Sequence, residues 1–456
     1  MTQWPVLDRR WVTAAYGVFT VYAAVSAGLS GGEDRVWAIW AVCGYGIATL
    51  LLWRTLCSPG GTTPHDPPRW AWTAPLVVSI ALALVAPLLW NSVAFPLEDG
   101  MKVIDRSAGL LVHHGSPYLP AHQVRSWFSY NPYLPVMALS GMPAAAGWPG
   151  LLGNAGVWLA VATVVVLGAA FWIAVPPGAA RRGRVLLVTA IAVASPVVAL
   201  NLAVITTDPP VLAFILLSLA LAARPSVSRS SLRPDNAVWA GVALAVACVL
   251  KDTAWLAIPV MLAMFWCRDG LRAAIRFIVA LLAAALVLIA VLAPATLIHP
   301  AAMKAMIRDT VLFPLGLTTY KTPAQSLLPG HLLTQMGTAG HVLSVGLLLA
   351  AGLGVAVWLV VKPPRDVRAA AWRLAIGLTL MFALGPDVRF GYFLYPLGLL
   401  GLLALTPRPA DLSPADLSPA SPSPADLSAD VVDDGEKLTD EGAQHGEPGQ
   451  PDEALR

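Results

Sequence analysis

Long apolar runs separated by short polar turns make up most of this chain. Runs of about 18 residues or more recur, and each is long enough to cross the ~30 Å hydrocarbon layer of a bilayer as a helix. The pattern predicts about twelve transmembrane helices, near residues 11–29, 36–56, 70–92, 151–175, 185–206, 207–223, 237–251, 253–267, 273–297, 340–361, 370–386 and 389–406. The predicted fold class is therefore an all-α polytopic membrane protein.

Two apolar runs depart from this simple pattern. The run 131–146 is short and rich in proline, so we expect an embedded or re-entrant piece that does not span the membrane. The first run follows Arg9 and Arg10 and ends near a Val-Ser-Ala sequence that resembles a signal-peptidase site. Because this run is long and other helices follow it, we expect an uncleaved first helix.

The lysines and arginines of the short turns predict how the helices are oriented. They form six basic clusters: Arg9 and Arg10; Arg54 and Arg69; Arg181, Arg182 and Arg184; Arg224, Arg229 and Arg233; Arg268, Arg272 and Arg276; and Lys362, Arg365 and Arg368. If residues 131–146 do not span, an even number of crossings separates consecutive clusters. All six clusters then lie in the cytoplasm, as basic loops prefer, and so do both termini.

The same count places the remaining polar features together on the other side. They are the first extracytoplasmic loop (93–130), Asp208, the Lys251-Asp252 pair, the 298–338 loop and the segment from Asp387 to Arg389. Ionisable residues at membrane helix ends are costly unless they serve a purpose. Their placement on one face predicts a single extracytoplasmic site in the cytoplasmic membrane.

Composition supports this class and excludes others. Hydrophobic residues make up 57% of the chain and charged residues only 12%, against roughly 25% charged in globular proteins. The net charge of +3 reports helix orientation and does not indicate nucleic-acid binding. The four cysteines lie in or beside apolar segments without a Cys-x-x-Cys pair, so we expect small buried hydrophobes.

The composition changes after Thr406. Residues 407–456 begin with Pro/Ser/Ala repeats and continue as an acidic stretch without an apolar face. Such a segment cannot bury a core, so we expect a disordered cytoplasmic tail without chemistry of its own. The membrane domain is predicted to comprise residues 1–406.

The first extracytoplasmic loop carries the strongest candidates for chemistry. Glu98 and Asp99 stand directly outside a predicted helix, where partial desolvation makes a carboxylate a better general base. Adjacent residues on a helix point about 100° apart, so one of the two faces the site. The pattern of residues 101–112 predicts an interfacial helix, on which Asp105 pairs with Lys102 or Arg106.

Several other residues of the external face could contact a ligand. His113 and His114 could bind a phosphate or a sugar hydroxyl, but their spacing does not suit a metal site. Tyr118 and Tyr130 are either interfacial belt residues or platforms for a sugar ring. The candidates also include Asp208 for sugar or acceptor binding, and Lys251 and Arg389 as cations for a lipid-linked phosphate.

These residues resemble glycosyltransferase family 87, a family of GT-C membrane enzymes. The resemblance rests on Asp99, Ala108, Leu110, Leu111, Gly115, Pro117, Tyr118, the 130–132 Tyr-Asn-Pro segment and the 251–259 segment that begins at Lys251. It implies that Asp99 is the family's catalytic acidic residue and that Lys251 is the family's helix-end lysine. Gly100, Ile104 and Ala254 depart from the family pattern, which puts the donor sugar in doubt more than the class.

The resemblance implies a GT-C-like bundle that transfers a sugar from a polyprenyl-phosphate carrier to a lipid or cell-envelope glycan. Mannose, another hexose or a pentose would move, and no cofactor is predicted, although a divalent metal is not excluded. Membrane lipids are the other expected partners. A transporter or flippase of lipid-linked sugars is the main alternative, although no half-to-half repeat is evident. A membrane scaffold without catalysis is a third.

Overall fold

Helices account for nearly all of the computed structural model, which describes residues 9–57, 70–95, 98–175, 181–224, 235–321 and 326–405. No strand occurs in these ranges, and all of them lie within one unit, Trp4–Thr406. Arg69, Arg229, Arg233 and the predicted tail, 407–456, lie outside the described residues. The all-α prediction is confirmed for the part that the structure describes.

Seven of the described helices are long and apolar enough to cross a membrane. They are α1 (Arg9–Leu29), α2 (Gly32–Cys57), the run Thr73–Ala94, α8 (Ala155–Ala174), α14 (Leu271–Leu292), α18 (Thr338–Val361) and α19 (Val367–Leu384). The run Thr73–Ala94 belongs to α3 (Trp70–Ile80), the π-helical η2 (Ala81–Val85) and α4 (Ala86–Ala94). An eighth crossing is formed if α9 (Arg181–Ala194) and α10 (Pro196–Ala203), bent by 64°, count as one span. The chain is a multi-pass membrane protein.

The other predicted spans form shorter helices. They are α11 (Asp208–Ala223), α12 (Asn236–Leu250), α13 (Ala257–Asp269) and α20 (Leu394–Leu405). The described residues therefore provide seven or eight full-length spans where about twelve were expected. Most residues of α11 and α12 are buried among other helices. Their apolar side chains therefore pack in the protein interior as well as on a lipid-facing surface.

Small residues let these inner helices approach closely. Gly241 on α12 faces α14, where a Cβ would stand 2.5 Å from the carbonyl oxygen of Phe277. Membrane helices gain no hydrophobic free energy by associating in lipid, so close van der Waals contacts of this kind hold them together instead. Cys248 is buried in this interior, but Cys43, Cys57 and Cys267 are exposed. The prediction of buried cysteines is wrong for those three, because they face outward from the bundle.

The N-terminal helices have a core of their own, around Trp37 and Tyr45. Trp37 donates a hydrogen bond of 2.8 Å to the carbonyl oxygen of Ala83 in the π-helical turn. Tyr45 donates one of 2.7 Å to the carbonyl oxygen of Ala194, at the bend between α9 and α10. Irregular turns release such carbonyl oxygens, and buried ones need a donor. The two side chains therefore tie the N-terminal helices to the rest.

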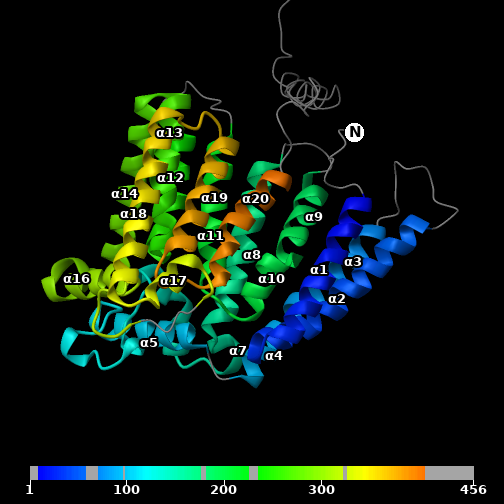
Figure 1. Ribbon diagram of the computed structural model, residues 1–456, viewed down its shortest axis with the longest axis horizontal. Helices are drawn as coiled ribbons and strands as arrows, with labels where there is room; N and C mark the ends of the chain where they lie inside the picture. Colours follow the sequence, from blue (N-terminus) through cyan, green and yellow to red (C-terminus); the bar gives the residue numbers. More distant parts are fainter. Residues whose placement is uncertain are drawn as a thin grey trace, which may run out of the picture. The chain divides into compact units, whose positions relative to one another are not determined.

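Short and irregular elements gather at one end of the helices (Figure 1). They are α5 (Asp99–His114), η3 (Ala121–Gln123), η4 (Trp127–Ser129), η5 (Pro135–Gly141), α6 (Met142–Ala145), α7 (Gly150–Gly153), η6 (Asp252–Leu256), α15 (Pro294–Ile298), α16 (Pro300–Ile307), η7 (Arg308–Leu312), α17 (Pro329–Thr334) and η8 (Phe390–Phe393). The expected re-entrant piece, residues 131–146, contains η5 and α6, and neither is a span.

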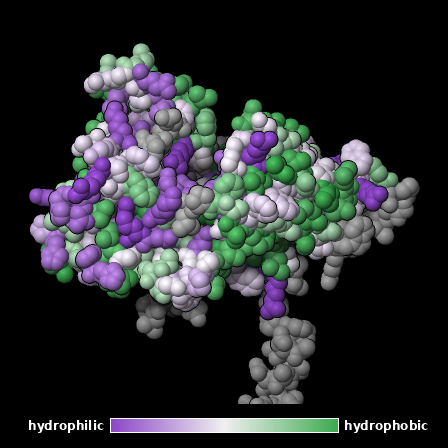
Figure 2. Space-filling model, turned by 90° about the horizontal axis from the view of Figure 1, so that it is seen from below, coloured by the Kyte–Doolittle hydropathy of each residue, from purple (hydrophilic) through white to green (hydrophobic). Residues whose placement is uncertain are grey.

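Helix α5 is amphipathic, as the sequence predicts. It buries Met101, Ile104 and Leu111 and leaves Lys102 and Val112 exposed. Gly115 ends it with a positive φ of 65°, a backbone conformation that favours glycine. Figure 2 looks at this end of the molecule, where hydrophilic side chains gather on one part and hydrophobic ones cover the N-terminal helices.

Candidate active site

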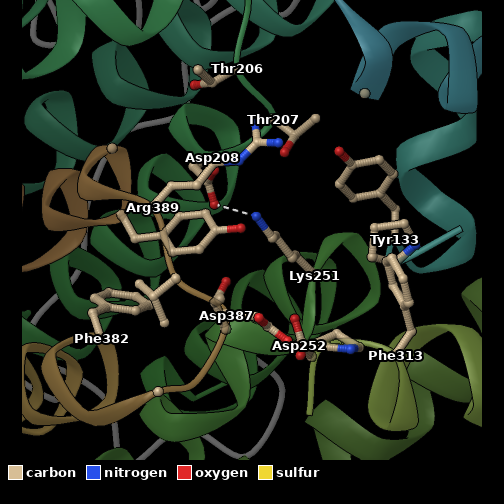
Figure 3. A pocket seen from close by; sticks show the side chains of 18 of the residues that line it. Tyr133, Thr206, Thr207, Asp208, Lys251, Asp252, Phe313, Phe382, Asp387 and Arg389 are labelled. Carbon is tan, nitrogen blue, oxygen red and sulfur yellow. Dashed lines mark hydrogen bonds and ion pairs between the residues drawn. The ribbon is translucent and has the colours of Figure 1, made fainter. Parts of the chain in front are cut away.

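A cavity of about 300 Å³ lies among these irregular elements (Figure 3). Its walls come from the start of α5, the 130–133 segment, the start of α11, the turn after α12, residues 313–315 and the 385–392 segment. Segments distant in sequence thus meet at one site. Of the predicted site residues, the lining includes Glu98, Asp99, Tyr130, Asp208, Lys251 and Arg389.

Three predicted site residues do not line this cavity. His113 and His114 lie exposed at the last turn of α5. Tyr118 is buried, and its hydroxyl donates a hydrogen bond of 3.0 Å to the carbonyl oxygen of Tyr133. Tyr118 therefore supports the cavity wall from behind.

An ion pair forms part of the cavity wall. Lys251 Nζ lies 2.7 Å from Asp208 Oδ1, and the two residues are only 6% and 5% exposed. The Tyr395 hydroxyl donates a second hydrogen bond of 2.8 Å to the same oxygen. Burial alone lowers the pKa of Lys251, but the Asp208 carboxylate and its hydrogen bond raise it above the ordinary value. Lys251 therefore stays protonated, and Asp208 already balances its charge.

A strained turn brings Asp208 to this position. Ile205 has a positive φ of 58°, which a β-branched residue rarely adopts. The chain reverses there, and the Thr206 amide donates a hydrogen bond of 2.9 Å to the carbonyl oxygen of Asn201. Asp208 then stands in the first turn of α11, where the helix dipole favours a carboxylate. Strain of this kind is common at functional sites.

Asn131 fixes the segment that carries Tyr130 and Tyr133. Its side-chain oxygen accepts a hydrogen bond of 3.1 Å from the Tyr133 amide, and its backbone amide donates one of 3.1 Å to Asp309 Oδ2. Tyr130 stacks on Phe313, with ring centroids 4.5 Å apart. The sequence analysis missed Asn131 and Asp309 as supports, although the Tyr-Asn-Pro motif indicated the first.

Asp99 and Arg389 are exposed charges of the cavity, and Glu98 beside them is half-buried. Asp99 Oδ1 lies 3.0 Å from Lys102 Nζ, and the Asp99 side chain is 51% exposed. Glu98 Oε2 accepts a hydrogen bond of 2.6 Å from the Gly100 amide, while Glu98 Oε1 lies 3.5 Å from Arg389 Nη1. Ion pairs this exposed contribute little to stability, so all three groups can meet a ligand at small cost.

The predicted pairing of Asp105 is wrong. Lys102 pairs with Asp99, and Arg106 donates hydrogen bonds to the carbonyl oxygens of Phe128 and Ser129. Asp105 Oδ1 is buried without a partner in the described part of the chain. Burial raises the pKa of Asp105 to about 6.

Two further carboxyl groups line the cavity, Asp252 and Asp387. Burial raises the pKa of each to about 6. Lys251 partly offsets the effect for Asp252, while His331, His341 and Lys321 do so for Asp387. The sequence marked both residues only as external charges, because nothing local shows that they enter a cavity. Within the described ranges, no group of three or more His, Cys, Asp or Glu side chains is arranged to hold a metal ion.

Several apolar spans and a polar cavity among helix ends define a multi-pass membrane protein with a ligand-sized site. No family model and no curated protein matches the chain. Among solved structures, it is similar to ArnT from Cupriavidus metallidurans in the apo state, at 17% sequence identity and a TM-score of 0.42. The match covers 76% of this chain and 61% of that one, so this chain spans about three fifths of its length. Similarity of this degree does not establish a shared activity.

Proposed function

We propose that the protein is an integral-membrane glycosyltransferase of the GT-C type. It would move a sugar, mannose or another hexose or pentose, from a polyprenyl-phosphate carrier to a lipid or cell-envelope glycan. One observation carries the proposal. Asp99, which the family 87 resemblance marks as catalytic, shares a cavity with two cations, Lys251 and Arg389. Nucleophile activation and phosphate binding could therefore take place in the same space.

In this reaction the acceptor hydroxyl attacks the anomeric carbon of the donor, and the bond from that carbon to the phosphate oxygen breaks. Asp99 takes the hydroxyl proton as general base, and Glu98 lies beside it. General-base catalysis is worth roughly 10²–10⁴-fold in rate. Tyr130, stacked on Phe313, and Asp208 line the cavity and would shape the wall that the sugar contacts.

Arg389 is the main cation for the departing lipid phosphate. Its side chain is 52% exposed, and Glu98 stands 3.5 Å away, so a phosphate can displace the carboxylate at small cost. Lys251 is already paired with Asp208, so it would contribute only a longer-range electrostatic attraction to the phosphate from the cavity wall. Charge stabilisation of this kind acts on the leaving group as its charge develops.

The position of the basic clusters supports a site on the outer face. The ends of α9, α14 and α19 that carry Arg181, Arg272 and Arg368 lie at the opposite end of the helices from α5 (Figure 1). Basic residues prefer the cytoplasmic side. A cavity on the other side cannot receive nucleotide sugars, which are made in the cytoplasm, but it can receive a lipid-linked donor.

The test is transfer of label from radiolabelled polyprenyl-phosphate mannose to a lipid extract, in membranes that contain the protein. Asp99→Asn should transfer about 10²–10⁴-fold more slowly than wild type. Asp269→Asn, at the cytoplasmic end of α13, is the matched control and should keep the wild-type rate. If Asp99→Asn is as fast as wild type, the catalytic assignment is wrong. Uptake of lipid-linked sugar without a covalent product would support the transporter instead.

A further inference from the structure

Acidic groups outnumber basic ones in the cavity. Its lining includes the carboxyl groups of Glu98, Asp99, Asp208, Asp252 and Asp387, against the two cations Lys251 and Arg389. Asp208 neutralises Lys251 at 2.7 Å, and Glu98 lies 3.5 Å from Arg389. A lipid phosphate gains a second negative charge when it leaves the sugar, and it would do so among surplus carboxylates. A proton supplied to that phosphate would remove the repulsion.

Asp387 occupies the place from which such a proton could come. It lines the cavity two residues before Arg389, the proposed phosphate ligand (Figure 3). His341, in the first turn of α18, approaches the same glycine as Asp387. Asp387 Oδ2 lies 3.3 Å, and His341 Cε1 3.0 Å, from the point that a Cβ on Gly316 would occupy. Gly316 has a φ of +67°, and its missing side chain leaves room for the two groups to approach.

His341 has a free nitrogen at this junction. Its Nε2 is buried and has no hydrogen-bond partner among the residues that the structure describes. The same atom lies 3.7 Å from the position of a Cβ on Gly316, and Asp387 Oδ2 lies 3.3 Å from that position. A buried polar nitrogen without a partner is costly. His341 is close enough to Asp387 for its charge to act on the pKa of that carboxyl group.

The other charges around Asp387 are those of His331 and Lys321, besides Arg389 in the cavity. His331 Nδ1 lies 3.0 Å from the carbonyl oxygen of Pro386 and so holds the backbone next to Asp387. Burial raises the pKa of Asp387 to about 6, and the two histidines and Lys321 partly offset it. The second pKa of a phosphate monoester is also about 6, so a proton passes between the two groups with little change in free energy.

We infer that Asp387 is a second catalytic residue, the general acid that protonates the departing lipid phosphate. This inference rests on the proposed function. The electron pair of the broken carbon–oxygen bond goes to the phosphate oxygen, and the proton of the Asp387 carboxyl group follows it. Asp387 is left as a carboxylate and recovers a proton from water. The proton of the acceptor hydroxyl goes separately to Asp99.

Asp252 is the competing candidate and fits less well. It directly follows Lys251, whose positive charge favours the ionised carboxylate. It also accepts backbone hydrogen bonds, including one from Thr253, which stabilise the same form. No histidine contributes to its pKa, whereas two contribute to that of Asp387.

The test is the pH dependence of kcat for the purified protein with polyprenyl-phosphate mannose, from pH 5 to pH 9. The wild-type kcat should fall about tenfold per pH unit above the pKa of Asp387 in the complex. This decline is the alkaline limb of the pH profile. Asp387→Asn should be roughly 10²-fold slower, with an unchanged KM and without this alkaline limb. His341→Gln should displace the limb along the pH axis. His299 is exposed, directly follows α15 in the chain and does not line the cavity. The control variant His299→Gln should therefore match wild type.

An alkaline limb that persists in Asp387→Asn would overturn the inference, and the unchanged KM would show that the variant is folded. The same limb together with complete loss of wild-type activity on chelation would assign charge neutralisation to a divalent cation instead. A wild-type protein that forms no product at any pH would contradict the proposed function itself. The three outcomes are distinct.

Discussion

Lys251 and Asp208 are 43 residues apart along the chain, yet their charged atoms are 2.7 Å apart at the cavity wall. Each charge would cost several kcal/mol to bury alone. Their mutual attraction, the Tyr395 hydroxyl and the ring of Tyr392, 4.5 Å from Lys251 Nζ, offset that cost. The pair therefore behaves as one unit, and each partner depends on the other.

We predict that Lys251→Met lowers the free energy of unfolding by about 3–5 kcal/mol, because it leaves Asp208 buried and unpaired. The double variant Lys251→Met with Asp208→Asn should lose clearly less than Lys251→Met alone. Denaturant unfolding in detergent measures all the variants. Strictly additive losses would show that the two side chains are not coupled.

Asp105 is half-buried, and its Oδ1 is buried without a hydrogen-bond partner in the described residues. Its pKa is raised to about 6, so the carboxylate destabilises the folded state above that pH. The penalty disappears as the pH falls through about 6 towards 4, where the unfolded chain is protonated as well. Asp105→Asn should therefore be more stable than wild type at pH 8, by about 1 kcal/mol. Thermal unfolding at pH 8 and pH 4 measures this, and an advantage of equal size at both would contradict it.

Among the elements, α5 matters most to the site, because its N-cap residue Glu98 and its first residue Asp99 line the cavity. It rests on η5 through Gly141, where a Cβ would lie 2.9 Å from the carbonyl oxygen of Ile104 and 3.1 Å from Ala108 Cβ. Gly109, on another face of α5, has nothing within 4 Å of its Cβ position. The two glycines are a matched pair.

Gly141→Ala should destabilise the protein by about 1–3 kcal/mol, because α5 or η5 must shift to admit the methyl group. The shift would move Asp99, so transfer activity should fall too. Gly109→Ala should instead stabilise the protein by roughly 0.5–1 kcal/mol, because it removes a flexible residue from a helix interior without a clash. Unfolding of both variants in one detergent gives the comparison. Equal effects would show that α5 does not pack on η5 through Gly141.

The sequence predicted the helices better than it predicted the tertiary contacts between them. Apolar runs located the helices, and the spacing of residues 101–112 located α5, because both signals are local. The 64° bend between α9 and α10 and the π-helical turn at Ala81–Val85 were missed, because tertiary contacts from Tyr45 and Trp37 support them. Asp252 and Asp387 were missed for the same reason: convergence on a cavity depends on the packing of distant segments.

For the whole molecule, the proposal depends on which side of the membrane each end of the helices faces. The ends of α9, α14 and α19 that carry Arg181, Arg272 and Arg368 lie at the opposite end of the helices from α5 (Figure 1). The first residue of α5, Asp99, lines the cavity. A lipid-linked donor in the outer leaflet can reach the cavity only if the polar end faces outward. Three exposed side chains report on these two ends: Asp99 and Arg389 at one, and Arg365 at the other.

The most direct test places single cysteines at Asp99, Arg389 and Arg365 in a protein whose four native cysteines are replaced. A membrane-impermeant maleimide is then applied to intact cells and to permeabilised cells. Asp99→Cys and Arg389→Cys should react in intact cells, and Arg365→Cys only after permeabilisation. If Asp99→Cys and Arg389→Cys reacted from opposite sides, or only after permeabilisation, a single outward-facing transfer site would be contradicted.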